Sequence, residues 1–102
     1  MDQRTELIKP MLRISEIGKW NGAVTLHVEG RLIGPWVPEM RAACEAAQRE
    51  HELQLDLGDL EFVDDSGIRL LLGLLGQGVA LDSAPPFIRE QLRIARGEKS
   101  ST

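Results

Sequence analysis

The sequence predicts a small α/β domain with a mixed sheet of about four strands and helices mainly on one face of that sheet. Three observations carry this prediction. Apolar and polar residues alternate over residues 23–29 and 53–57, as in strands that are buried on one side. Apolar residues recur at helical spacing over residues 37–51 and 66–76. The dipeptide Asn21-Gly22 lies between two alternating segments, which indicates a β-hairpin.

The elements are expected in the order β-β-α-β-α-β-α. Pro38 suits the first turn of the first helix, where its missing N–H is not needed. Asp and Ser at the start of the second helix are residue types that accept bonds from free N–H groups there. The two β-α-β crossovers are expected to be right-handed. The predicted strands cover residues 11–17, 23–29, 53–57 and 79–81, and the predicted helices cover residues 37–51, 66–76 and 86–96.

A length of 102 residues allows one domain. The mixed, polar residues 1–10 are expected to form a flexible lead-in, and residues 97–102 a disordered tail. The domain itself is therefore expected over residues 11–96.

Charge and composition exclude several classes of function. Lys and Arg total 12 against 16 Asp and Glu, a net charge of −4, and nucleic-acid binding needs clustered Lys and Arg. The longest strongly apolar stretch, residues 68–75, is far shorter than the roughly 20 residues of a membrane span. The single cysteine, Cys44, forms no internal disulfide, and the polar N-terminus does not resemble a signal peptide. We therefore expect a cytoplasmic protein with no nucleic-acid partner and no membrane insertion.

The acidic segment 56–65 is the first place where chemistry could reside. Asp56, Asp64 and Asp65 offer oxygen ligands for Mg²⁺, which would suit a phosphate-handling enzyme. The alternative is a set of solvated loop charges with a helix cap, and we favour it. His27 and His51 are expected to be solvated rather than catalytic. No catalytic residue, metal site or cofactor is predicted.

The second predicted helix is apolar over more than one face. Its stripe of Ile68, Leu71, Leu72 and Leu75 is expected to pack on the sheet, with Leu71 and Leu75 buried together with Leu26 and Leu55 of the strands. Leu70 and Leu74 fall outside that stripe, so they either contact a neighbouring helix or form an exposed surface for a partner. Cys44 lies on the apolar stripe of the first helix and is expected to be buried and slow to react.

Three short motifs follow one another along the chain. Residues 28–32 read Val-Glu-Gly-Arg-Leu, residues 53–57 read Leu-Gln-Leu-Asp-Leu, and residues 62–68 read Phe-Val-Asp-Asp-Ser-Gly-Ile before a leucine-rich helix. In this order they resemble the STAS domain of bacterial anti-sigma-factor antagonists. The resemblance extends over about residues 11–96 and implies a STAS-like sandwich.

In that family the turn usually reads Asp-Ser-(Ser or Thr)-Gly, and a partner kinase that is also the anti-sigma factor phosphorylates the first Ser. Here Asp64, Ser66 and Gly67 correspond to the family's Asp, second hydroxyl residue and Gly, whereas Asp65 stands at the phosphoacceptor position. A carboxylate takes no stable seryl phosphate, so the resemblance implies a module that phosphorylation does not switch at this position, with Asp65 as a weak permanent mimic of phosphoserine. Ser66 is the alternative phosphoacceptor.

The resemblance implies a non-enzymatic regulatory module of signal transduction and transcription regulation that binds a protein and needs no cofactor. Its partner would be an anti-sigma factor related to serine kinases. Similar STAS subunits bind the ATPase of lipid-transport ABC complexes, so a transporter ATPase is the alternative partner. The oligomeric state stays open. The residues assigned to the partner surface and switch are Asp64, Asp65, Ser66 and Gly67, bordered by Arg69, Leu70 and Leu74.

Overall fold

The computed structural model describes residues 12–97, and the lead-in and tail expected at the two ends fall largely outside this range. The elements follow the predicted order, with one short 3₁₀ turn added before the first helix. The strands are β1 (Leu12–Trp20), β2 (Ala23–Leu32), β3 (Glu52–Val63) and β4 (Ala80–Ser83), and the helices are η1 (Gly34–Trp36), α2 (Val37–Gln48), α3 (Asp65–Gly76) and α4 (Pro86–Ala95).

The four strands form one mixed sheet in the order β1-β2-β3-β4. β1 and β2 are antiparallel and are joined at Asn21-Gly22, whose φ values of 52° and 82° are those that this dipeptide accepts in a tight hairpin turn. β2 and β3 are parallel, as are β3 and β4. The predicted hairpin and the predicted mixed sheet are both confirmed.

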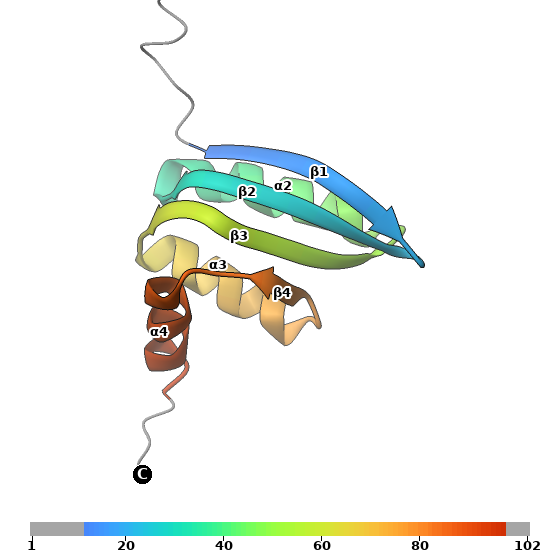
Figure 1. Cartoon of the computed structure of the whole chain (residues 1–102). Coiled ribbons are helices and arrows are strands. Elements are labelled where there is room, and N and C mark those ends of the chain that lie inside the picture. The colour runs from blue at the N-terminus through green and yellow to red at the C-terminus, as the bar shows by residue number, and fades with distance from the viewer. Residues whose placement is uncertain (1–11, 98–102) are drawn as a thin grey trace, which may run out of the picture.

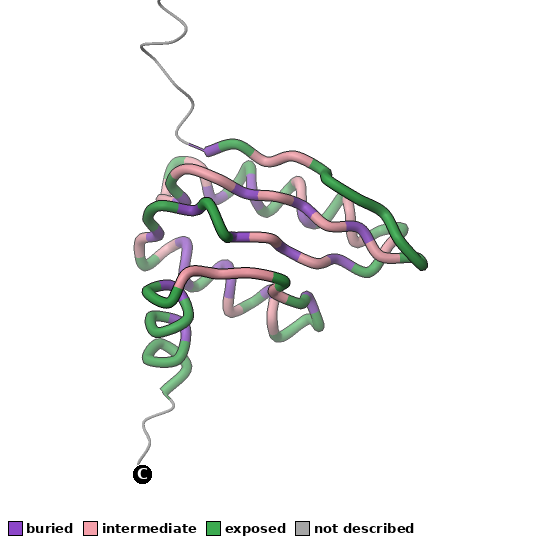
Figure 2. Tube along the Cα trace, in the orientation of Figure 1, coloured by how far each residue is buried: buried purple, intermediate pink, exposed green. Residues whose placement is uncertain are grey.

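The helices cover one face of the sheet. Figure 1 shows α2 and α3 side by side behind the strands, with α4 beside α3 at the β4 side of the sheet. Within residues 12–97 no helix covers the opposite face, and in Figure 2 buried and half-buried positions alternate along the first part of β2 and through the first half of β3. The one-sided sandwich predicted from the period-2 pattern is therefore confirmed. Over residues 12–97 no helix combines the length and the apolar character needed to cross a membrane.

The core lies between the sheet and the two helices behind it. Leu55 and Leu71 are fully buried and Leu26 is 6% exposed, whereas Leu75 is only partly buried at the edge of this cluster. Cys44 is fully buried, and desolvation raises the pKa of its thiol to about 11, with the nearby Glu45 charge acting in the same direction. A thiol with this pKa is almost entirely protonated at neutral pH, which agrees with the expected low reactivity.

Of the two alternatives for Leu70 and Leu74, contact with a neighbouring helix is confirmed, and an exposed surface for a partner is wrong. Their exposed fractions are 7% and 4%, and both belong to the core cluster. A shallow groove between α2 and α3 is lined by both leucines together with Arg41 and Glu45 of α2. Since α3 packs on the sheet with one face and beside α2 with another, it must be apolar around more of its circumference than a helix with a single buried face.

The strands are longer than predicted. β3 continues through Gly58 and Asp59 to Val63, where the sequence predicts a loop. The pairing register of β2 with β3 shifts between His27 and Glu29. This irregularity allows β3 to stay paired with β2 beyond Gly58. Ile17 of β1 is 54% exposed and lies at a similar irregularity, between Glu16 and Gly18.

Candidate functional site

The turn from β3 into α3 is built around the side chain of Asp64. This residue is the N-cap of α3: it has extended backbone geometry, and its Oδ1 accepts the N–H of Gly67 at 2.8 Å. Its Oδ2 accepts the N–H of Gly34 at 2.9 Å. The carboxylate therefore ties the start of α3 to the segment that follows β2, and it meets one of the free N–H groups of the first helical turn.

These hydrogen bonds favour the ionised form of the carboxyl. The Gly67 N–H lowers the pKa of Asp64 most, partial desolvation opposes it, and the Gly34 N–H lowers the pKa further. Since each oxygen of Asp64 already accepts a backbone bond, the side chain acts in the fold rather than as a free ligand.

Gly67 permits a close approach of α3 to the strand ends. A Cβ at this position would lie 2.5 Å from the carbonyl oxygen of Leu32 and 2.6 Å from Cγ2 of Val63. Neither the backbone oxygen nor a fully buried valine can move far without disturbing the sheet. Glycine is therefore required at this position for packing.

Asp65, Ser66 and Arg69 lie together at the start of α3. Asp65 is exposed in the first turn, Ser66 is half-buried, and Arg69 is exposed one turn further along the helix. We refer to these three residues as the α3-start surface. An anion in the first turn is favoured by the free N–H groups and by the positive end of the helix dipole.

The structure thus separates the seven residues that the sequence assigned to one surface. Asp65, Ser66 and Arg69 are accessible together at the α3-start surface. Asp64 and Gly67 hold the turn in place, and the burial of Leu70 and Leu74 removes them from the accessible set.

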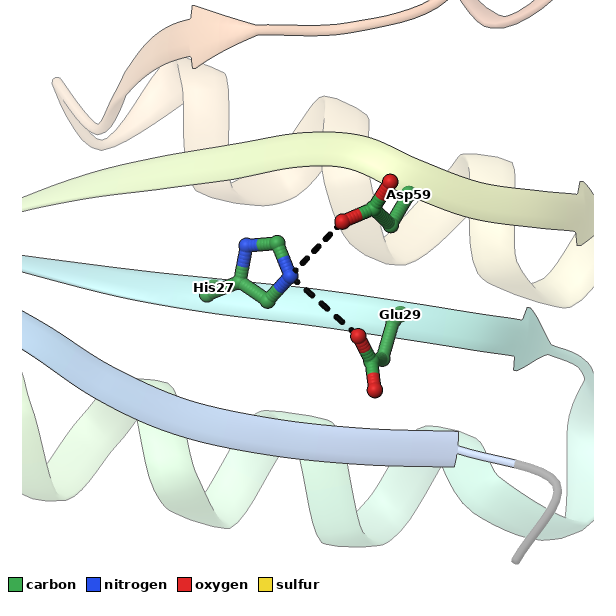
Figure 3. A group of neighbouring side chains, drawn as sticks. All are labelled: His27, Glu29 and Asp59. Atoms are coloured by element: carbon green, nitrogen blue, oxygen red, sulfur yellow. Dashed lines mark hydrogen bonds and ion pairs between the residues drawn. The ribbon is translucent and has the colours of Figure 1, made fainter.

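A second group of polar side chains lies on the open face of the sheet and is not apparent from the sequence alone (Figure 3). His27 Nδ1 lies 3.1 Å from Oδ2 of Asp56. His27 Nε2 lies 3.3 Å from Oε1 of Glu29 and 3.1 Å from Oδ2 of Asp59. The alternation pattern places His27 and Asp56 on the same face, but only the parallel register of β2 and β3 sets His27 opposite Asp56 and Glu29 opposite Asp59.

The carboxylates around His27 favour the imidazolium form. The hydrogen bond to Asp56 raises the pKa of His27 most; desolvation opposes this, while Glu29 and Asp59 add to the rise. The pKa of Asp56 is lowered, chiefly by the Gly58 N–H at 3.0 Å from Oδ1 and to a smaller extent by His27. His27 is thus 20% exposed and held by acidic neighbours, rather than simply solvated as expected.

The magnesium site considered for Asp56, Asp64 and Asp65 does not form. Asp56 faces His27, whereas Asp64 caps α3. Within residues 12–97 one group of three such side chains has ligand atoms that all lie within 4.8 Å of one another, and it consists of His27, Glu29 and Asp59.

Comparison with known proteins gives two findings. The family model described as "Mlab, STAS domain" matches residues 17–99. Nine solved chains are similar in structure, among them an anti-sigma factor antagonist from Mycobacterium paratuberculosis, with a TM-score of 0.70 and 19% identity over 87% of this chain and 81% of that one. No curated protein sequence matches this chain.

Proposed function

The chain belongs to the STAS domain family, and we propose that it is a non-enzymatic regulatory module that binds another protein through the α3-start surface. The observation that carries the proposal is that some residues of the turn before α3 serve the fold while their neighbours stay exposed. Asp64 and Gly67 are used by the fold, which leaves the neighbouring carboxylate of Asp65 and guanidinium of Arg69 facing solvent.

A protein partner suits this surface better than a small substrate. Asp65 and Arg69 present opposite charges one helical turn apart on an exposed helix end, and Arg69 also lines the groove between α2 and α3. Such a pattern gives electrostatic complementarity and orientation to a docking protein. The carboxylate that a hydrolytic site would need beside Asp65 is that of Asp64, and both of its oxygens accept backbone N–H groups.

Asp65 supplies a permanent negative charge at the position where the family's antagonists carry a phosphorylated serine. Its charge is about −1, compared with about −1.5 to −2 for phosphoserine, and it has fewer acceptor oxygens. The module is therefore proposed to stay in one binding state. Ser66 is an unfavourable substitute acceptor because its phosphate would lie beside the charges of Asp64 and Asp65. Mass spectrometry of the protein from its native host is expected to find Ser66 unphosphorylated, and stoichiometric phosphate there would contradict a fixed state.

Two classes of partner remain. The first is an anti-sigma factor related to serine kinases, in keeping with the structural similarity to an anti-sigma factor antagonist. The second is the ATPase of a transporter, and Asp65 favours it because a partner that is not a kinase has no need of a serine at this position.

Affinity capture from an extract of the native host separates these classes. The immobilised wild-type domain is compared with Asp65→Lys, which reverses the exposed charge at the start of α3. Glu50→Lys is the matched control, because Glu50 is exposed in the turn before β3, at the other end of that strand. Retained proteins are identified by mass spectrometry.

We expect the wild type and Glu50→Lys to retain the same anti-sigma factor or transporter ATPase, and Asp65→Lys to lose most of it. Retention of neither class by the wild type would contradict the proposed function. Equal retention by Asp65→Lys and Glu50→Lys would contradict the assignment of the surface.

A further inference from the structure

The open face of the sheet brings three potential metal ligands to one point, independently of the α3-start surface. His27 and Glu29 lie two residues apart on β2 and project from the same face, and Asp59 of β3 is paired with Glu29. The Nε2 atom of His27 and one oxygen from each of Glu29 and Asp59 all lie within 4.8 Å of one another. Figure 3 shows both carboxylates directed at the same ring nitrogen.

We propose that His27, Glu29 and Asp59 bind a divalent transition-metal ion such as Zn²⁺, with Asp56 orienting the imidazole. Imidazole nitrogen with carboxylate oxygen is a donor set that suits zinc and its neighbours in the first transition row, whereas Mg²⁺ and Ca²⁺ prefer oxygen alone. Three protein ligands leave a fourth position for water, as in open zinc sites.

The two distances from His27 Nε2 to the carboxylate oxygens are close to those between ligands of a tetrahedral ion, one of them slightly shorter. Ligands about 2.0–2.2 Å from zinc at tetrahedral angles lie roughly 3.3–3.6 Å from each other. His27 Nε2 is 3.3 Å from Oε1 of Glu29 and 3.1 Å from Oδ2 of Asp59. The ion would replace the proton that these groups now share, and the Asp59 side chain, which is 66% exposed, has room to adjust around it.

Asp56 prepares the ring for this role. Its Oδ2 lies 3.1 Å from Nδ1 and accepts the proton there, which leaves the lone pair of the neutral ring on Nε2. Metal-binding histidines usually donate the N–H of their other ring nitrogen to a carboxylate. This hydrogen bond fixes the tautomer and makes the metal-binding nitrogen more basic. Asp56 is in turn fixed by the Gly58 N–H at 3.0 Å.

The local charge also favours a divalent cation. With His27 neutral, the group holds the three carboxylates of Glu29, Asp56 and Asp59, and one guanidinium, that of Arg13, lies 3.4 Å from Oε2 of Glu29. The group then carries two negative charges, which one divalent ion would neutralise. Arg13 contacts Oε2, so Oε1 of Glu29 stays directed at His27.

The test is calorimetric titration of the full chain with ZnCl₂ at pH 7.5, with thermal melting as a second readout. We expect saturable binding of one ion per chain and a higher melting temperature with zinc, because an ion that binds only the folded state stabilises it. His27→Asn, Glu29→Gln and Asp59→Asn should each weaken binding by more than about tenfold. Asp56→Asn should weaken it about 10-fold, as loss of an orienting carboxylate does elsewhere.

The control is His51→Asn, which removes the other histidine, in the turn before β3, and should leave zinc binding unchanged. Thermal melting without zinc checks that each variant is folded. Because Asp59→Asn changes a largely exposed side chain, this variant is expected to fold and to remain informative. Lowering the pH should weaken binding, because the proton competes for Nε2. Absence of zinc binding by the wild type, or unchanged affinity in the folded Glu29→Gln and Asp59→Asn variants, would overturn the proposal.

Discussion

At the scale of single residues, adjacent positions in the turn before α3 have different roles. Asp64 accepts two backbone N–H groups and ties two segments together, whereas the side chain of its neighbour Asp65 projects to solvent. Two acidic residues of similar chemistry are therefore expected to respond differently to the same substitution.

Asp64→Ala is expected to lower the free energy of unfolding by about 0.5–2 kcal/mol, the usual effect of losing an N-cap. Urea denaturation at neutral pH measures this loss. The lowered pKa of Asp64 means that its contribution is present above the usual value of 3.8 and is lost as the pH falls through the lower, folded-state pKa. Asp65→Ala is the matched control and should change stability much less. Equal losses in the two variants would contradict the assignment of Asp64 as the cap.

Gly67 and Gly73 provide a second matched pair, within α3. A Cβ at Gly67 would lie 2.5 Å from the Leu32 carbonyl oxygen, so Gly67→Ala is expected to destabilise the fold. A Cβ at Gly73 would meet no atom within 4 Å, so Gly73→Ala should stabilise the helix by roughly 0.5–1 kcal/mol. Thermal melting compares the two variants, and a stable Gly67→Ala would show that the helix start is looser than described.

At the scale of the elements, α3 is held between the sheet and α2. The helical stripe of Ile68, Leu71, Leu72 and Leu75 could be recognised from the sequence because it follows the local period. Ile68 and Leu71 are buried, whereas Leu72 and Leu75 are partly buried against the core. For Leu70 and Leu74 the sequence left helix contact and exposure as alternatives, and only the position of α2 beside α3, which no local pattern encodes, decides for burial.

Leu74→Ala is therefore expected to cost about 2–5 kcal/mol of folding stability, the range for a buried leucine. Ile94→Ala in α4 is the control, because Ile94 is 62% exposed, and it should have little effect. Chemical denaturation of the two variants measures the difference. A nearly unchanged stability of Leu74→Ala would place this side chain back on an accessible surface.

The same distinction between local and non-local information applies to the strands. The hairpin at Asn21-Gly22 and the one-sided alternation are local, and both were predictable. The continuation of β3 through Gly58 and Asp59 was not, because it depends on a register shift against β2. The group around His27 was missed for the same reason, since Asp56 and Asp59 become neighbours of His27 only when the two parallel strands are aligned.

At the scale of the whole molecule, the domain has two polar regions on different elements: the α3-start surface and the group around His27. The helix start is proposed to bind a protein, and the open sheet face is proposed to bind a metal ion. The His27 group also couples the folding equilibrium to pH, because its charge state differs between the folded and unfolded chain.

His27 is expected to stabilise the fold more at low pH than at high pH. Its pKa is raised in the folded state, chiefly by Asp56, so its contribution is complete below the usual value of 6.5 and is lost as the pH rises through the folded-state pKa. Urea denaturation with a chelator present, between about pH 5.5 and 8.5, measures this. The stability difference between wild type and His27→Asn should shrink as the pH rises, with His51→Asn, which removes a histidine outside this group, measured as the control. A difference that grows with pH would contradict the ion pairing described here.

The central claim is that the start of α3 is the surface that binds the partner protein. Its most direct test is an NMR titration of the isotope-labelled domain with the purified partner obtained by capture. We predict that the backbone amide signals of residues 64–69 shift or broaden first, and that those of β2 around His27 and of α4 stay unchanged. A footprint on the open sheet face or on α4, with unchanged signals from residues 64–69, would contradict the account.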